Sequence, residues 1–209
     1  MNKNVSLLTV ALLLTGASSA FAASSTDLTV TGIITPAACT PVLSNNGTVD
    51  FGKTSAKDLN QTSVTHLGTE KLQVNVGCDA ATTFALTLLD NRSSSTHNPY
   101  QYGLGKTSAN ENLGGFTVTY FDAITDSGPK NVIVSFDEGE TWRNNQHIPV
   151  DPFSWAAVGD TSTGSWYPVV TSNLAMNVEV DAFIARADSL TLTDEVTLDG
   201  SATLQIKYL

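Results

Sequence analysis

The residues of this chain that could carry chemistry are two cysteines, Cys39 and Cys78, and three histidines, His66, His97 and His147. A zinc site requires closely spaced ligands, as in C-x-x-C or H-x-x-x-H, and the sequence contains neither spacing. The histidines lie far apart in polar stretches, so we expect solvated loop residues and neither a metal site nor a cofactor. A serine nucleophile on a strained turn would appear as G-x-S-x-G, which is also absent. The sequence therefore predicts a protein that is not an enzyme.

The acidic residues in the middle of the chain also favour a structural role over a catalytic or metal-binding one. Asp122, Asp126 and Asp151 lack the spacing of a calcium loop. Residues 135–142 fit S-x-D-x-G-x-T-W, which resembles the Asp-box hairpin of sialidases and other β-propellers, where it is a structural turn present in several copies. This chain has one copy and is too short for a six-bladed propeller. We expect a tight turn in which Asp137 accepts backbone hydrogen bonds and Trp142 packs beneath.

Residues 1–22 have the pattern of a secretory signal peptide. Lys3 gives a short basic region, about ten apolar residues follow, and Ala20-Phe21-Ala22 provides an A-x-A cleavage site. The apolar stretch has about half the length that a membrane-spanning helix needs, and no other segment is longer and as apolar. Cleavage after Ala22 would leave 209 − 22 = 187 residues, which is the length of one domain. We expect this domain not to insert into a membrane.

The net charge and the two cysteines limit the kinds of partner and site that this protein can have. The formal net charge is −10, and loss of Lys3 with the signal peptide makes it −11. Such an acidic surface repels phosphate backbones and anionic lipid, which argues against nucleic-acid binding. An even pair of cysteines in a secreted chain favours a Cys39–Cys78 disulfide over a metal site or a catalytic thiol. Closing a loop of about forty residues would stabilise the fold by roughly 4 kcal/mol.

Alternating apolar residues predict strands along most of the chain. We expect one hairpin from the rows at 72–78 and 84–88, joined by residues 79–82. The second strand is buried on both faces if Ala85 and Leu89 also point inward. A second hairpin joins the rows at 116–120 and 132–136 across the turn at 126–129. Residues 174–184 form the longest row and predict a central strand. The last row has Ala202, Leu204, Ile206 and Tyr208 on one face and Thr203, Gln205 and Lys207 on the other.

Two stretches lack such periodicity. We expect residues 90–115 to form a long surface loop, with at most one short strand, and residues 144–168 to be irregular. No part of residues 23–209 shows sustained helical spacing, so helices are short or absent. The expected fold is an antiparallel β-sandwich.

Residues 26–35 form one more alternating row, in which the apolar positions are Leu28, Val30 and Ile34 and the position between the last two is Gly32. This row precedes Cys39, and the next thirty residues contain no obvious hairpin partner for it. We infer that the strand serves a neighbouring molecule, the alternative being an edge strand of its own domain.

In this arrangement the chain resembles the pilin subunits of chaperone/usher fimbriae of Gram-negative bacteria. Gly32 stands seven residues before Cys39, Cys78 follows 39 residues later, and the chain ends Tyr208-Leu209. The ending at residues 199–204 resembles that of a poorly characterised branch of fimbrial-like secreted proteins. One departure concerns the glycine that the family commonly places about fourteen residues from the C-terminus, because Gly200 here is tenth.

The resemblance implies an incomplete immunoglobulin-like sandwich at residues 37–209, preceded by a donor-strand extension at residues 23–36. A hydrophobic groove would be filled by a strand from a periplasmic chaperone and later, at the outer-membrane usher, by the extension of another fimbrial subunit. The residues of the donor strand would be Leu28, Val30, Gly32 and Ile34. The strand holding Ala202, Leu204, Ile206 and Tyr208 would pair with the incoming strand. The subunit would pass through the periplasm to a fimbria on the cell surface.

A different kind of function is also compatible with the sequence. Tyr100, Tyr102, Trp142, Trp155 and Trp166 fall in or beside the two long irregular stretches, and exposed aromatic side chains can stack on sugars. The alternative is therefore a minor or tip subunit that binds a receptor or carbohydrate. Two-domain adhesins of this family place a lectin domain before the pilin domain, whereas here the first predicted strand follows the cleavage site almost at once.

Overall fold

The computed structural model describes residues 29, 31, 38–162 and 164–209. The chain divides between Ile34 and Thr35 into two units, and the strands named below belong to the second unit. Helical structure in the described residues is limited to the 3-10 turns Ser44–Gly47, Ala56–Asp58, Ser93–Ser95 and Ala187–Ser189. The strands are β1 (Cys39–Leu43), β2 (Thr65–Thr82), β3 (Phe84–Asp90), β4 (Tyr102–Gly103), β5 (Gly114–Thr125), β6 (Gly128–Ser135), β7 (Arg143–Asn144), β8 (Trp155–Ser162), β9 (Ser165–Pro168), β10 (Thr171–Ile184) and β11 (Ala202–Tyr208).

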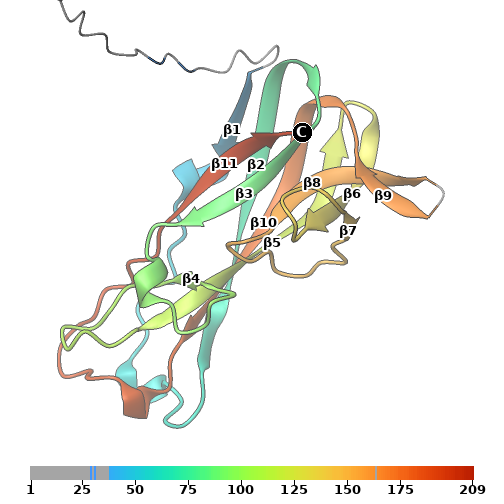
Figure 1. The fold of residues 1–209 in the computed structure, drawn as a ribbon. Helices are drawn as coiled ribbons and strands as arrows, with labels where there is room; N and C mark the ends of the chain where they lie inside the picture. The colour runs from blue at the N-terminus through green and yellow to red at the C-terminus, as the bar shows by residue number, and fades with distance from the viewer. Residues whose placement is uncertain (1–28, 30, 32–37, 163) are drawn as a thin grey trace, which may run out of the picture. The chain divides into compact units, whose positions relative to one another are not determined.

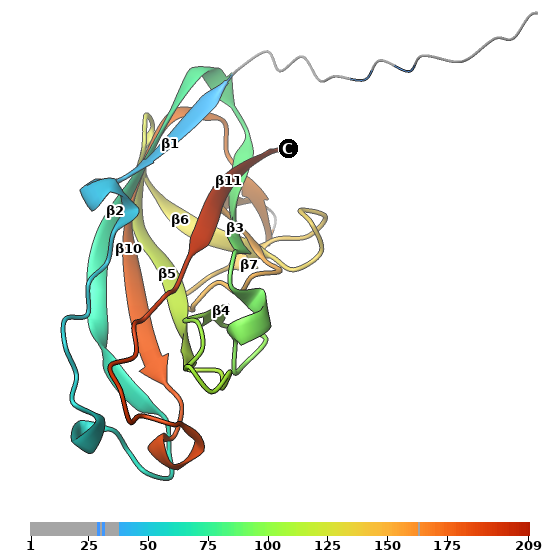
Figure 2. The ribbon, with the colours of Figure 1, turned by 90° about the vertical axis from the view of Figure 1, so that its left-hand side faces the viewer.

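The strands pair antiparallel along one path, β1-β2-β10-β5-β6-β8-β3-β11. The first four strands, with β4 added to β5, make one sheet, and the last four, with β7 and β9, make the other. Strand β6 belongs to both, because residues 128–130 pair with β5 and residues 131–135 pair with β8. Figures 1 and 2 show the two sheets as layers that face each other. The predicted all-β, immunoglobulin-like sandwich is confirmed.

The core fills the space between the inward faces of the two sheets. The predicted central strand is confirmed, since β10 lies between β2 and β5 and its even-numbered residues 174–184 are all buried. Opposite them lie Phe84, Leu86 and Leu88 of β3, Val132 and Val134 of β6, and Ala156 and Val158 of β8. The period-two rows therefore identified these buried faces correctly, except that Phe136, at the end of the row at 132–136, is 51% exposed. Within the described residues, no helix has the length and apolar character needed to cross a bilayer.

The first predicted hairpin is wrong. Strands β2 and β3 belong to different sheets, and the chain passes from one sheet to the other at Thr83, between the end of β2 and the start of β3. Alternation reports which face of a strand is buried and contains no information about which strand lies beside it, so a sheet change looks like a hairpin in the sequence. Ala85 is buried as expected, on the outer face, whereas Leu89 is 55% exposed.

The second hairpin is confirmed at its tip, where residues 123–125 pair with residues 128–130. The expectation that residues 144–168 are irregular is wrong, because this stretch contains β8 and β9. Strand β8 begins Trp-Ala-Ala-Val-Gly, and its small residues are buried on both faces, so no alternation marks it. Residues 90–115 form the expected connection with one short strand, β4, but Tyr102 and Leu104 are buried in it.

Candidate functional site

The two ends of the strand path, β1 and β11, lie on the same side of the sandwich (Figure 2). Within the described residues β1 pairs only with β2, and β11 pairs only with β3, over seven residue pairs from Ala202–Asp90 to Tyr208–Phe84. Each strand therefore has one edge whose backbone groups make no ladder in the described part of the chain. One further strand between these edges would close the sheet.

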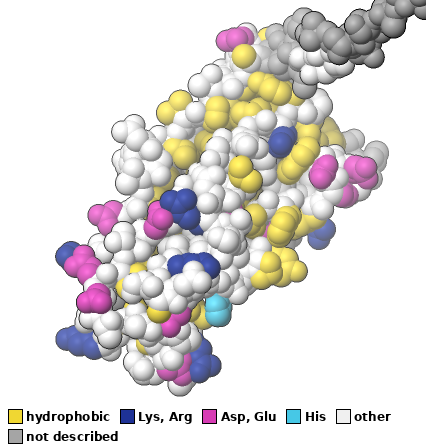
Figure 3. All heavy atoms as spheres, turned by 60° about the vertical axis from the view of Figure 1, so that its left-hand side comes forward, with side chains coloured by type: hydrophobic (Ala, Val, Ile, Leu, Met, Phe, Trp, Pro, Cys, Tyr) yellow, Lys and Arg dark blue, Asp and Glu magenta, His cyan; other side chains and the backbone are white. Residues whose placement is uncertain are grey.

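An apolar groove of about 810 Å³ opens between the two edges. Its floor includes Leu72, Val178 and Val180, together with Phe116 and Tyr120, and its rim includes Leu43 on one side and Leu204 on the other. Burial raises the pKa of the Tyr120 phenol, which stays a neutral hydroxyl. Hydrophobic side chains gather in the upper part of the face shown in Figure 3, and charged side chains are most frequent near its lower end. A lining this apolar fits side chains of an apolar segment.

The C-terminal strand turns the predicted face toward the groove. Ala202, Leu204 and Ile206 pack against the main core while remaining only half-buried. Tyr208 is 41% exposed, and its neighbour Leu209 is 45% exposed. An edge strand beside an open groove turns alternate residues inward but leaves them incompletely buried, as observed here.

The disulfide between Cys39 and Cys78 is present and joins β1 to β2 at directly paired positions. At the same end of the groove the backbone N–H of Cys39 donates a hydrogen bond of 2.8 Å to the Tyr208 hydroxyl. The tyrosine side chain thus reaches across from β11 to β1. This end is called the Cys39 end below, and the opposite end, where β11 begins, is called the Gly200 end.

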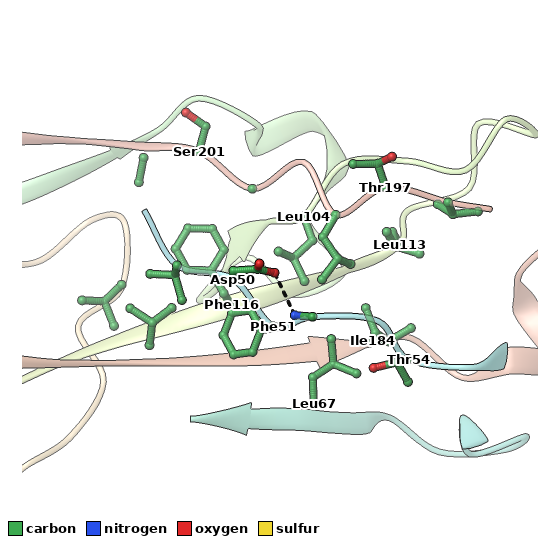
Figure 4. Close-up of a pocket in the computed structure, with 18 of the residues that line it drawn as sticks. Asp50, Phe51, Thr54, Leu67, Leu104, Leu113, Phe116, Ile184, Thr197 and Ser201 are labelled. Atoms are coloured by element: carbon green, nitrogen blue, oxygen red, sulfur yellow. Dashed lines mark hydrogen bonds between the residues drawn. The ribbon is translucent and has the colours of Figure 1, made fainter. Parts of the chain in front are cut away.

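Segments without regular structure line the Gly200 end. Residues 49–54, which come after β1 in the chain, line one side of this end. Residues 192–201, which lead into β11, line the other side (Figure 4). Lys53 and Glu195, on the two segments, approach to 3.7 Å. A Cβ added to Gly200 would lie 2.9 Å from Leu104 Cδ2 and 3.1 Å from Phe116 Cε1, so this glycine permits a close approach to the floor.

The segment that leads into β11 is anchored to the rest of the sandwich by two groups. Glu111 accepts hydrogen bonds from the backbone N–H of Thr191 at 2.6 Å and from its hydroxyl at 2.9 Å. Arg92 binds the Asp199 carboxylate through two nitrogens, at 2.9 and 3.0 Å. These contacts fix the rim at the Gly200 end.

The predicted donor-strand residues Leu28, Val30, Gly32 and Ile34 lie outside the described residues, as do residues 1–22 of the predicted signal peptide. Of the predicted pairing strand, Ala202 and Leu204 line the groove, and the disulfide joins β1 to β2 beside it. The predicted donor stays a prediction. Sequence reasoning missed the walls formed by residues 49–54 and 192–198. Their only signal is scattered apolar residues such as Val49, Phe51 and Val196.

The aromatic residues do not form a loop-borne platform. Trp142, Trp155 and Trp166 are half-buried on the outer face of the second sheet, where they pack around Ala85, Ile133 and Ala157. Tyr102 is fully buried in β4, and of the two tyrosines Tyr100 alone is largely exposed, at 65%.

The Asp-box turn is built as predicted. The Asp137 carboxylate accepts hydrogen bonds from the Ser135 hydroxyl at 2.6 Å and from the Thr141 backbone at 2.9 Å, and these bonds lower the pKa of Asp137 to about 2. The Trp142 indole donates to the Gly139 carbonyl. The histidines differ from the expectation in part, because His66 lies on β2 and contacts Asp181, and His147 contacts Glu179.

Comparison with known proteins adds two relatives and one family model. The model matches residues 28–99 and is described as a protein of unknown function (DUF1120). The protein YhcF of Escherichia coli K12, which carries the name "uncharacterized protein", is 28% identical over 92% of this chain and 94% of its own length. Protein GltF of the same strain is 27% identical over 95% of each chain. The similarity to both relatives therefore extends over nearly the whole chain.

Proposed function

We propose that this chain is a structural subunit of a surface fimbria, and that its open groove is filled by a strand from another polypeptide. The observation that carries the proposal is the position of β1 and β11, each with one edge unpaired within the described residues, on either side of an apolar groove. An uncovered edge beside apolar surface is a template for aggregation, and a strand from another chain would cover it. Adding a strand satisfies the backbone groups of both edges at once, which is β-augmentation.

The N-terminal row of the sequence supports the same function. Full burial of Leu28, Val30 and Ile34 would contribute about 5 to 9 kcal/mol, at roughly 1.5 to 3 kcal/mol for each side chain. A strand with these residues can therefore supply a large part of the stability of the sandwich that receives it. A periplasmic chaperone would fill the groove first, and at an outer-membrane usher another subunit would replace it. In this function the protein is not an enzyme and needs no cofactor.

Deletion of residues 23–35 tests the proposal, because it removes the outgoing strand and leaves the groove intact. We expect the shortened protein to accumulate in the periplasm as a monomer bound to a chaperone, and to form no fibres when it is the only subunit supplied. Size-exclusion chromatography and electron microscopy of shed fibres measure the two outcomes.

A matched control replaces Thr29 and Thr31 with serine, which keeps the length of the segment and its apolar row. This variant should assemble like the unmodified chain. Fibres of normal length from the deletion variant would rule the proposed function out.

A further inference from the structure

We propose that the hydrogen bond from Cys39 to the Tyr208 hydroxyl is a latch, which bridges the groove when no strand fills it and withholds the edge of β1 from pairing. The inference rests on the proposed function and adds how access to the groove is controlled. The reason lies in the backbone groups that the two edges turn toward the groove.

The pairing of β1 with β2 determines which backbone groups of β1 face the groove. In an antiparallel ladder alternate residues bond to the neighbouring strand, and the residues between them point their N–H and C=O groups to the other side. Ala38 bonds toward β2, since its carbonyl accepts from the Asp79 backbone N–H at 2.9 Å. The backbone groups of Cys39, Pro41 and Leu43 therefore point toward the groove.

This edge of β1 has few donors to offer a second strand. Pro41 has no N–H group, and the Cys39 N–H is bonded to the Tyr208 hydroxyl at 2.8 Å. Leu43 supplies the remaining N–H of the three positions. Proline on an edge strand hinders unwanted pairing, and the tyrosine adds to this effect by occupying a second position. The edge of β1 is therefore a poor template for a strand while the latch is closed.

The edge of β11 is equipped differently. The backbone N–H of Leu209 donates to the Thr83 carbonyl at 3.2 Å. At the other end, the backbone N–H of Asn91 donates to the Ser201 carbonyl at 2.9 Å. These bonds place the odd-numbered residues in the ladder with β3, so the even-numbered residues of Ala202–Tyr208 point four N–H and four C=O groups toward the groove. β11 can therefore form a complete ladder with an entering strand, whereas β1 cannot until the latch opens.

The latch is the firmer of two bridges across the groove. Thr83 fixes the residue after Tyr208, because its carbonyl accepts from the Leu209 N–H and its hydroxyl donates to a Leu209 oxygen at 3.1 Å. At the opposite end of the groove Lys53 and Glu195 meet at 3.7 Å, but their side chains are 89% and 84% exposed. An ion pair this exposed contributes little. The bridge that an entering strand has to open is therefore the one at Tyr208.

Opening the latch exchanges one acceptor for another. A backbone carbonyl of the entering strand would take the Cys39 N–H, and the Tyr208 hydroxyl would turn to solvent. The number of hydrogen bonds to β1 is then unchanged, so the latch delays a strand without excluding it. Before a strand arrives, it also hinders two copies from pairing edge to edge through β1.

Amide exchange followed by NMR tests the latch on the chain lacking residues 23–35, in which no N-terminal strand can fill the groove. Tyr208→Phe removes the hydroxyl and keeps the ring. We expect the Cys39 amide to exchange about five- to tenfold faster in this variant, since one hydrogen bond is lost, and the Leu43 amide to be unchanged. Tyr167→Phe, which alters an exposed tyrosine of β9, is the matched control and should change neither rate.

Uptake of a dye-labelled peptide with the sequence of residues 24–35, followed by fluorescence anisotropy, should be faster by a similar factor in the Tyr208→Phe variant. Faster exchange at Cys39 together with faster uptake supports the inference. Equal exchange at Cys39 overturns it, and so does faster exchange with unchanged uptake. If neither this peptide nor an unrelated alternating apolar peptide enters either form, the proposed function is contradicted, and the Cys39 amide still decides whether the latch exists.

Discussion

At the scale of single residues, buried polar groups that link loops to strands hold the sandwich together. Ser135 is fully buried, donates to Asp137 and accepts a hydrogen bond of 2.8 Å from the Gly139 backbone. The Asp-box pattern predicted this turn from sequence, because its residue types have fixed hydrogen-bonding roles at fixed positions. The partners of the histidines could not be predicted in this way, since Asp181 lies 115 positions from His66.

Replacing Ser135 with alanine should destabilise the protein by about 1 to 3 kcal/mol, because the half-buried backbone N–H groups of Asp137 and Gly139 would lose their acceptor. Chemical denaturation measures the change in the free energy of unfolding. Ser108→Ala is the matched control, since Ser108 is exposed, and its effect should stay within about 0.5 kcal/mol. Equal effects of the two substitutions would show that the turn contributes nothing to stability.

Asp126 links the β5–β6 turn to the start of β10. Its carboxylate accepts from the backbone N–H groups of Ser172 and Asn173 at 2.7 and 2.8 Å, and from the Asn173 amide at 2.8 Å. These bonds, with the Asn173 side chain first, lower the pKa of Asp126 from 3.8 to about 2. Because the pKa is depressed in the folded state, the stabilisation is present above about pH 4 and is lost as the pH falls toward 2.

The Asp126→Asn variant should therefore melt at a lower temperature than the unmodified protein at pH 7, and the difference should shrink between pH 4 and pH 2. Melting curves followed by circular dichroism across this range provide the measurement. The exposed Asp58, changed to asparagine, is the control for the loss of one negative charge. A difference that is independent of pH would contradict the assigned role of the carboxylate.

At the scale of elements, the strands with strict alternation were predicted well and those without it were not. β10 has one buried face, β11 has one face that packs against the core, and the period of two reports both faces directly. β8 was not predicted because its own small residues are buried on both faces, so they show no alternation. The sheet change between β2 and β3 depends on contacts distant in sequence, which a local pattern does not contain. The groove could not be predicted for the same reason, since residues 49–54 and 192–198, which form its walls, show no periodic pattern.

The face of β11 that borders the groove should be more sensitive to substitution than its outer face. Replacing Ile206 with asparagine places an amide among core residues and should cost about 1 to 3 kcal/mol, with loss of periplasmic yield as capture by a partner strand weakens. The neighbouring change Gln205→Asn alters the outer face and should leave both quantities unchanged. Immunoblots of periplasmic extracts give the yield, and equal yields would count against the role assigned to β11.

At the scale of the whole molecule, the sandwich is a sheet path with two ends that do not meet. The Tyr208 hydroxyl receives the Cys39 N–H across the gap, where an inserted strand would offer a backbone carbonyl to β1 instead. Residues 38–162 and 164–209 thus have the interior of an immunoglobulin-like domain, with one seam between β1 and β11 that no strand among them closes. The proposed function follows from this seam, and the relatives YhcF and GltF match the chain over nearly all of its length, so the same seam can be looked for in them.

Amide hydrogen exchange on a chain lacking residues 23–35, measured with and without a peptide of residues 24–35, tests the central claim most directly. The outward amides of an edge strand exchange quickly, and pairing with a new strand slows them. An open seam predicts that the peptide slows exchange in both β1 and β11 while leaving the outer strand β9 unchanged. Slow exchange of β1 and β11 in the absence of any peptide, or no change in either strand on adding a strand-forming peptide, would contradict it.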